Sequence, residues 1–336
     1  MKKIFAFLLL SVFLVSCTVA WAGGEANKIN VVTTIFPIYD WVREVVGENA
    51  SHVNMTLLLD NGVDLHSYQP AAQDILAIST ADLFVYVGGE SDEWVEDVLQ
   101  SAMNPSLKAI NLVEAMGEGI KTEEIVEGME HDHDHEDHED HEEHGEHEEH
   151  EHDHGHGDEA DEHVWLSLRN AGKLTKAIAD TLSEIDPDYA DQYHANAAAY
   201  IGKLTDLDAR YAETVSSSAC KTLLFGDRFP FRYLADDYGL TYYAAFTGCS
   251  AESEASFETI VFLAGKTDEL GLPAVLTIEH PKTRIAETIV QNTSAKNQKI
   301  LVMDSMQGTT ASDIQAGMTY LSVMEANLEV LKEALN

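Results

Sequence analysis

The sequence alternates short apolar segments with amphipathic ones, and it does so in two separate series. Runs of apolar and β-branched residues predict strands at 31–36, 53–58, 83–87, 222–225, 242–246, 275–278 and 300–303. Apolar residues at helical spacing predict helices between them, at 38–47, 71–79 and 256–269. This order is typical of parallel sheets covered by helices on both faces. The expected fold class is α/β, with two lobes of the (βα)4 type.

A long helical pattern separates the two series. It begins with Asp186-Pro187, a cap residue followed by a residue suited to the first turn, and continues to about Val215. About 28 helical residues would extend roughly 40 Å, enough for a rigid strut between lobes. We therefore expect a first lobe at 28–185, a linking helix at 186–216 and a second lobe at 217–336, with a ligand-binding cleft between the lobes.

The first lobe is interrupted by a His/acid-rich run, defined here as residues 130–162. Eleven of the sixteen histidines lie between His131 and His156, and the run holds eighteen acidic residues with no Lys or Arg. Such a composition cannot bury a core, so we expect a disordered loop at 128–162. Neutral imidazole is a good ligand for Zn²⁺, Cu²⁺ and Ni²⁺. The alternative is a charge run that only keeps the chain soluble, but that would not need a His at every second or third position.

The N-terminus has the pattern of a secretion signal, predicted at 1–22. Lys2 and Lys3 precede an apolar segment from Ile4 to Val15, which is too short to span a bilayer as a mature helix. The sequence then reaches Cys17 in a context similar to a lipobox, which predicts lipidation of Cys17 and anchoring to the outer side of the cytoplasmic membrane. The alternative is cleavage after Ala22, which would give a free periplasmic protein.

The net charge indicates what kind of ligand the chain binds, and the positions of the cysteines indicate whether they form a disulfide. A net charge of −39 argues against binding nucleic acid, whose phosphates need Lys and Arg, and favours cation capture. Cys220 and Cys249 are expected at opposite ends of neighbouring parallel strands, roughly 15–20 Å apart. A disulfide needs Cα atoms within about 7 Å, so free thiols are expected.

Four segments carry a resemblance to a known family. They are Thr33–Gly47 (TTIFPIYDWVREVVG), Gly62–Pro70 (GVDLHSYQP), Glu162–Ala171 (EHVWLSLRNA) and Val302–Gln307 (VMDSMQ). The chain resembles the metal-binding solute proteins of zinc and manganese ABC importers from about residue 28 to its C-terminus. The resemblance implies two α/β lobes on a rigid helix, one buried metal ion between them and no catalysis. It also implies an ABC permease and its ATPase as partners.

The resemblance also implies a set of metal ligands. His66, His163 and Asp304 match family ligands, whereas the place expected for the remaining His or Glu falls on Arg228, which cannot bind a cation. Asp227, one position earlier, is the nearest donor. Further candidates for this position are Cys249, Glu279, His280 and water.

The resulting prediction is an extracytoplasmic, monomeric zinc-binding lipoprotein that delivers Zn²⁺ to a membrane permease. Zinc is favoured over manganese because Mn²⁺ binds imidazole weakly. A secreted zinc hydrolase is the main alternative from another class. Outside the His/acid-rich run, however, the sequence has no HExxH, and it has no GxSxG or phosphate-binding loop. A cell-adhesion role would be compatible with transport, and the sequence does not address it.

Overall fold

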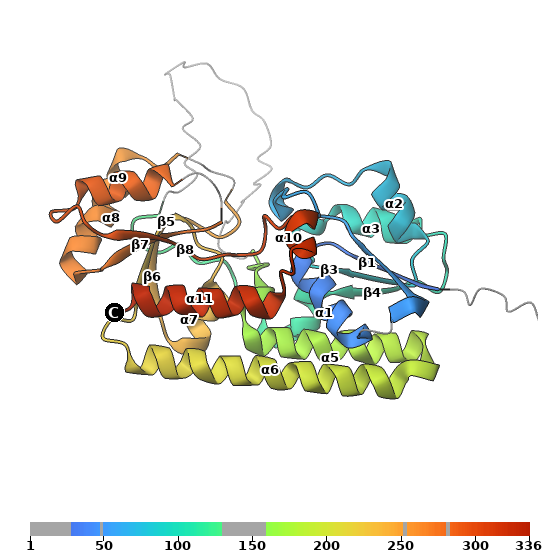
Figure 1. The fold of residues 1–336 in the computed structure, drawn as a ribbon. Helices are drawn as coiled ribbons and strands as arrows, with labels where there is room; N and C mark the ends of the chain where they lie inside the picture. Colours follow the sequence, from blue (N-terminus) through green and yellow to red (C-terminus); the bar gives the residue numbers. More distant parts are fainter. Residues whose placement is uncertain (1–27, 48–49, 130–158, 251–253, 280–282) are drawn as a thin grey trace, which may run out of the picture.

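The structure is a computed structural model that describes residues 28–47, 50–129, 159–250, 254–279 and 283–336 (Figure 1). The predicted signal peptide with Cys17, most of the His/acid-rich run, and His280 lie outside the described residues. Among the residues that are described, no helix is both long and apolar enough to cross a membrane.

Two four-stranded parallel sheets form the framework of the fold. The first sheet has the order β2-β1-β3-β4, with β1 (Ile29–Thr33), β2 (Val53–Leu57), β3 (Leu83–Tyr86) and β4 (Lys108–Asn111). The second has the order β6-β5-β7-β8, with β5 (Thr222–Arg228), β6 (Thr241–Phe246), β7 (Ala274–Thr277) and β8 (Lys299–Val302). The two-sheet α/β prediction is confirmed. Strand β4 was not predicted, because Ile110 is its one buried residue and leaves too short an apolar pattern.

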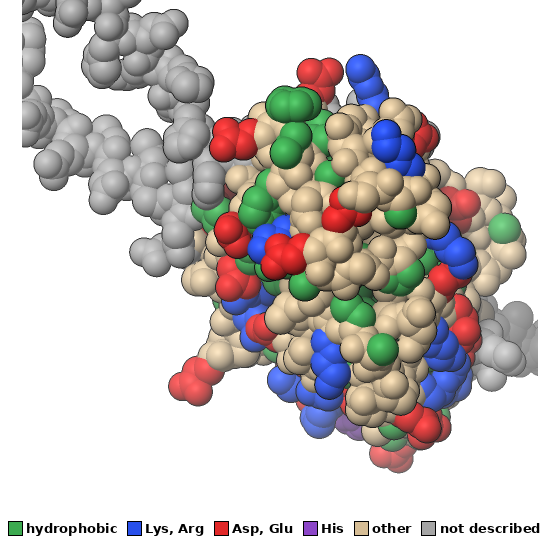
Figure 2. All heavy atoms as spheres, turned by 90° about the vertical axis from the view of Figure 1, so that its left-hand side faces the viewer, with side chains coloured by type: hydrophobic (Ala, Val, Ile, Leu, Met, Phe, Trp, Pro, Cys, Tyr) green, Lys and Arg blue, Asp and Glu red, His purple; other side chains and the backbone are tan. Residues whose placement is uncertain are grey.

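Helices pack on both sheets and connect the two halves. The first half contains α1 (Phe36–Val46), α2 (Ala72–Ser79), α3 (Trp94–Gln100), α4 (Leu112–Met116) and α5 (Leu168–Ile185). The second half contains α7 (Arg232–Tyr238), α8 (Phe257–Leu270), α9 (Arg284–Asn292), α10 (Ala311–Gln315) and α11 (Tyr320–Ala334). Seen from the end of the second half, the surface mixes acidic, basic and isolated apolar side chains, as solvated surfaces usually do (Figure 2).

The predicted linking helix is present as α6 (Ala190–Ser217, 28 residues), which runs beneath both sheets (Figure 1). Its start differs from the prediction, because residues 187–189 form a separate 3₁₀ turn. The Asp186 carboxylate does not cap the backbone and instead accepts a hydrogen bond from the Tyr193 hydroxyl at 2.9 Å.

The C-terminal end of the His/acid-rich run, which lies within the loop predicted at 128–162, pairs with a segment that precedes the run. An antiparallel bridge joins Thr122 to Ala160, and backbone hydrogen bonds link Glu123 N to Glu159 O (2.9 Å) and Asp161 N to Lys121 O (2.8 Å). We call this pairing of residues 121–123 with 159–161 the stem. It pairs the C-terminal end of the run with a segment that precedes the run in the sequence.

The last helix ties the second half back to the first. The Tyr320 hydroxyl donates to the Trp165 carbonyl at 2.7 Å, and its backbone N–H donates to the buried Asp40 carboxylate at 2.7 Å. The Tyr320 ring packs edge-on against Trp41. Because α11 contacts both halves, the predicted lobe boundaries at 185/186 and 216/217 stay predictions.

Removing the Tyr320 hydroxyl should destabilise the protein. In Tyr320→Phe the buried Trp165 carbonyl loses its donor, which typically costs about 1–3 kcal/mol. Urea unfolding followed by circular dichroism measures the change. The matched control is Tyr189→Phe, whose side chain is exposed, and it should change the free energy of unfolding by less than about 0.5 kcal/mol. Equal stabilities of the Tyr320→Phe variant and the wild type would contradict this interpretation of the α11 contact.

A buried acid near β3 should make stability depend on pH. Burial raises the pKa of Asp92 from 3.8 to about 7, and the Gly88 N–H donates to its Oδ2 at 3.0 Å. A carboxyl whose pKa is raised by folding stabilises the protein fully below pH 4, and this contribution is lost as the pH rises through about 7. The size is on the order of 1 kcal/mol per pKa unit. Asp92→Asn should therefore gain stability relative to the wild type at pH 8 and not at pH 4, in unfolding experiments with a chelator present. A difference that does not vary with pH would contradict the prediction.

Candidate metal centre

His66 is held on a short 3₁₀ helix, η2 (Leu65–Ser67), that follows β2. The Asp64 carboxylate caps this helix by accepting the His66 backbone N–H at 3.0 Å. The His66 Nδ1 lies 2.7 Å from the Ser91 hydroxyl and 3.7 Å from the Glu162 carboxylate. We assign the Nδ1 proton to this side, since both neighbours can accept it. The lone pair of Nε2 then points away from Ser91.

His163 directly precedes the 3₁₀ helix η5 (Val164–Leu166) and is completely buried. Its Nδ1 lies 3.0 Å from the Asp161 carboxylate, which also accepts the His163 backbone N–H at 2.9 Å. The Tyr233 hydroxyl donates to the Asp161 carbonyl at 2.9 Å, so the second half of the chain supports this turn. We assign the proton to Nδ1, which donates a hydrogen bond to the Asp161 carboxylate, and the lone pair of His163 is again on Nε2.

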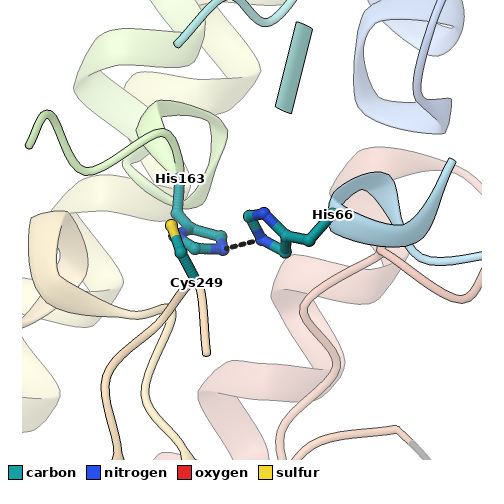
Figure 3. Close-up of side chains that lie close together, drawn as sticks. All are labelled: His66, His163 and Cys249. Atoms are coloured by element: carbon teal, nitrogen blue, oxygen red, sulfur yellow. Dashed lines mark hydrogen bonds between the residues drawn. The ribbon is translucent and has the colours of Figure 1, made fainter. Parts of the chain in front are cut away.

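The two Nε2 atoms face each other at 3.3 Å (Figure 3). Two nitrogens bound to one tetrahedral zinc ion at about 2.0–2.1 Å would be about 3.3 Å apart, so the pair has the spacing of a metal site. Burial, followed by the charges of His163 and Arg228, lowers the pKa of His66 to about 3 against a smaller opposing effect of Asp64. His66 is therefore neutral at physiological pH, which is the form that binds a metal ion.

A third donor comes from the second half of the chain. Cys249 lies in the turn after β6, and its Sγ completes a group with His66 and His163 in which all donor atoms lie within 4.8 Å of one another (Figure 3). Its backbone N–H donates to Glu123 of the stem at 2.9 Å. The preceding Gly248 lies so close to His163 that an added Cβ would be 3.0 Å from its Cε1. Both cysteines of the described chain are free thiols, and the predicted parallel pairing of β5 with β6 is confirmed.

The electrostatics at the thiol favour a cation. Burial raises the pKa of Cys249, and the nearby carboxylates of Glu123, Glu162 and Asp161 raise it further. These charges hold the proton on the thiol until a cation offsets them. One Glu162 oxygen is buried and has no hydrogen-bond partner among the described residues. Unsatisfied negative charge of this kind lowers the cost of bringing a dication into the interior.

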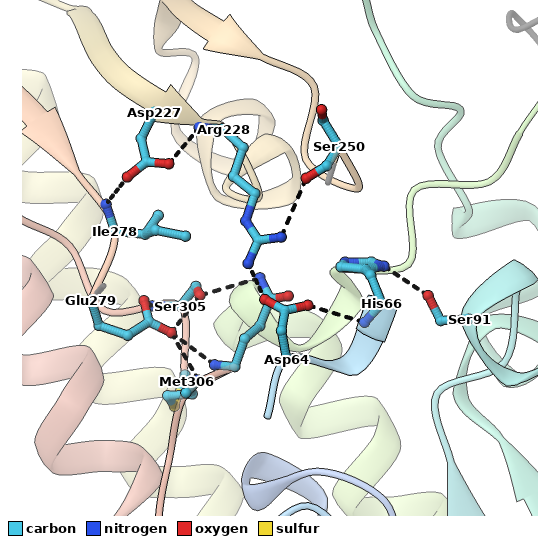
Figure 4. A network of polar contacts seen from close by, with 12 residues as sticks. Asp64, His66, Ser91, Asp227, Arg228, Ser250, Ile278, Glu279, Ser305 and Met306 are labelled. Carbon is cyan, nitrogen blue, oxygen red and sulfur yellow. Dashed lines mark hydrogen bonds and ion pairs between the residues drawn. The ribbon is translucent and has the colours of Figure 1, made fainter. Parts of the chain in front are cut away.

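Arg228 lies where the resemblance implied the remaining ligand. Its guanidinium forms an ion pair with Asp64 and donates to the Ser250 carbonyl at 3.4 Å (Figure 4). It therefore connects the His66 loop to the turn that carries Cys249. A guanidinium cannot coordinate a metal ion, so this position contributes a link between the halves and no ligand.

The geometry does not support Asp227 as a ligand. Its carboxylate accepts the backbone N–H of Arg228 at 2.9 Å and that of Ile278 at 3.3 Å, which turns it toward β7 (Figure 4). It does not belong to the group formed by the two histidines and Cys249.

Asp304 and Glu279 lie together at the ends of β8 and β7, also outside that group. Glu279 accepts hydrogen bonds from the backbone N–H groups of Ser305, Gln307 and Gly308, at 2.7–3.2 Å. Asp304 accepts the Met306 N–H at 2.7 Å, and burial followed by the Glu279 charge raises its pKa to about 7. Both acids order the loop after β8.

The residues that orient the histidines were not predicted from the sequence. Ser91, Asp161 and Glu162 determine which nitrogen of each imidazole carries the lone pair. Asp161 and Glu162 lie in the His/acid-rich run, where eighteen acids look alike, and Ser91 has no sequence pattern. For Asp161 and Glu162, the signal in the sequence was their position two residues and one residue before His163.

Comparisons with known proteins bear on the family to which this chain belongs. The family model described as ZnuA, zinc-uptake complex component A, periplasmic, matches residues 31–334. The "Zinc-binding lipoprotein AdcA" of Streptococcus pneumoniae strain R6 is 34% identical over 335 residues, which is 99% of this chain and 61% of the relative. The "High-affinity zinc uptake system protein ZnuA" of Bacillus subtilis is 31% identical over 98% of this chain and 94% of the relative.

A solved structure of a zinc-bound protein is also similar to this chain. The Zn(II)-bound ZnuA-like domain of Streptococcus pneumoniae AdcA has a TM-score of 0.68 at 30% identity, covering 92% of this chain and 99% of that one. The chain spans about 61% of the length of the streptococcal AdcA relatives that it matches. With a family model that covers almost all of the sequence, the chain belongs to the family of the periplasmic zinc-uptake complex component A, ZnuA.

Proposed function

We propose that this protein captures Zn²⁺ outside the cytoplasm and passes it to the membrane permease of an ABC importer. The observation that carries the proposal is the buried pair of Nε2 atoms 3.3 Å apart, each with its other ring nitrogen held by a polar partner. Neutral imidazoles oriented in this way bind a borderline-soft dication such as Zn²⁺ well. The family is one of zinc-uptake proteins and not of enzymes, and its relatives carry zinc-binding names.

The proposed partners and location follow from the family. ZnuA-family proteins work with an ABC importer, which supports a permease partner. We further propose that an ATPase drives this permease, that the chain acts as a monomer, and that lipidated Cys17 anchors it to the outer side of the cytoplasmic membrane. The name of the pneumococcal relative, a lipoprotein, supports the anchor. Treatment with a lipoprotein signal peptidase inhibitor should then block maturation of the wild type and not of Cys17→Ala.

The His/acid-rich run is proposed to collect Zn²⁺ through weak, exchangeable sites. Support comes from its composition and from the stem, which holds the C-terminal end of the run beside the metal centre. Glu123 of the stem accepts the Cys249 N–H, and Asp161 of the stem orients His163. Zinc is favoured over manganese as the bound ion, because two imidazoles suit Zn²⁺ better by the Irving–Williams order.

Substitution of the two histidines tests the site. His66→Ala and His163→Ala should each lower the affinity for one tightly bound Zn²⁺ by more than about 100-fold, because losing an outer-shell partner alone costs about 10–100-fold. Competition with a zinc chelator of known affinity measures the change. His194→Ala, on the exposed side of α6, is the matched control and should keep wild-type affinity. Wild-type affinity in either centre variant would reject the site.

A deletion and a point substitution distinguish the role of the run from that of its stem. Deleting residues 130–158 should remove several weak zinc sites and keep the tight one, since the stem stays intact. Asp161→Asn in the undeleted chain should weaken the tight site by about 10–100-fold, because Asp161 holds the proton on His163 Nδ1. Titration calorimetry and metal analysis distinguish the two classes of site. Loss of the tight site in the 130–158 deletion would mean that the run itself supplies a primary ligand.

A further inference from the structure

We propose that Cys249 is a direct ligand of the transported ion, so that the centre is of a His₂Cys type. The proposal rests on the proposed zinc function and specifies its third donor. His66 and His163 come from the first half of the chain, and Cys249 comes from the turn after β6 in the second half. An ion held by all three would connect the two halves.

The distances among the three donor atoms are close to those of a tetrahedral zinc site. The three donor atoms already lie within 4.8 Å of one another. For a tetrahedral zinc ion with Zn–S of about 2.3 Å and Zn–N of about 2.0–2.1 Å, the sulfur and each nitrogen would be about 3.5 Å apart. The sulfur-to-nitrogen distances therefore have to shorten by about 1.3 Å at most, whereas the two nitrogens are already at the required spacing.

The surroundings of Cys249 position this thiol beside His163. Its backbone N–H is bound by Glu123 of the stem at 2.9 Å, and the carbonyl of the next residue, Ser250, accepts from Arg228 at 3.4 Å. Gly248 lets the turn approach His163 without a side chain between them. The turn is thus held from both sides while the thiol faces the imidazoles (Figure 3).

Two carboxylates of the second half are engaged elsewhere. The carboxylates of Asp227 and Glu279 accept backbone N–H groups of neighbouring strands and loops. Arg228 occupies the place where the family resemblance implies a ligand, and it pairs with Asp64. Cys249 is the donor from this half that joins the described histidine pair.

Coordination by Cys249 has a defined chemistry. A Zn–S bond forms, the S–H bond breaks, and the proton is released to solvent, so the ligand is a thiolate. The thiolate cancels one of the two charges of the dication inside the protein. A soft sulfur donor also favours Zn²⁺ and Co²⁺ over Mn²⁺ more strongly than a carboxylate in the same place would.

Cobalt substitution tests the proposal directly. The full-length chain titrated with Co²⁺ alone should develop a thiolate-to-cobalt charge-transfer band in the near ultraviolet. Cys249→Ser should lose this band, and Cys220→Ser, the matched control at the far end of the same half, should keep it. Zinc affinity should fall by more than about 100-fold in Cys249→Ser and stay unchanged in Cys220→Ser.

A second measurement needs no variant. Alkylation of the wild-type chain, mapped by peptide mass spectrometry, should label Cys249 only when Zn²⁺ is removed and should label Cys220 equally with and without Zn²⁺. Two results would overturn the cysteine ligand and leave the zinc function standing. One is equal labelling of Cys249 with and without Zn²⁺. The other is a wild-type chain that binds Zn²⁺ tightly but whose Co²⁺ form has no charge-transfer band. Failure of the wild type to bind one Zn²⁺ tightly would overturn the proposed function itself.

Discussion

The candidate metal centre depends on the approach of two imidazole lone pairs inside the protein. His66 and His163 place their Nε2 atoms 3.3 Å apart, an arrangement that is repulsive unless a cation or proton lies between them. It persists because Ser91, Glu162 and Asp161 hold the opposite nitrogens. The 3₁₀ turns around each histidine, the ordered stem and the loop after β3 all serve to keep these partners in place.

The contacts that join the two halves gather around the same point. Arg228 pairs with Asp64 beside His66, Tyr233 supports Asp161 beside His163, and the Trp165 indole N–H donates to the Ser305 carbonyl at 2.9 Å. Any change in how the halves pack would therefore alter the positions of the donors. This gives a physical reason for coupling between ion binding and the arrangement of the halves, which a permease could detect.

The local patterns of the sequence predicted most of the fold. Buried strands such as 83–86 are continuous apolar runs, and α5 has a strong apolar face, so their type is evident without tertiary information. Strand β4 and helix α7 were missed because they are short, with few buried positions to set a period. The start of α6 was misplaced because Asp186 bonds to a tyrosine hydroxyl seven residues later instead of to the backbone.

For the candidate site, the sequence by itself pointed to a metal-binding protein and to His66 and His163 as candidate donors. The tertiary structure decided which other groups stand beside them. Asp227 and Glu279 look like good ligands in the sequence, but buried backbone N–H groups need acceptors, and those groups bind their oxygens. Cys249 joins the centre because folding brings together residues far apart in the chain, and no local pattern records that proximity.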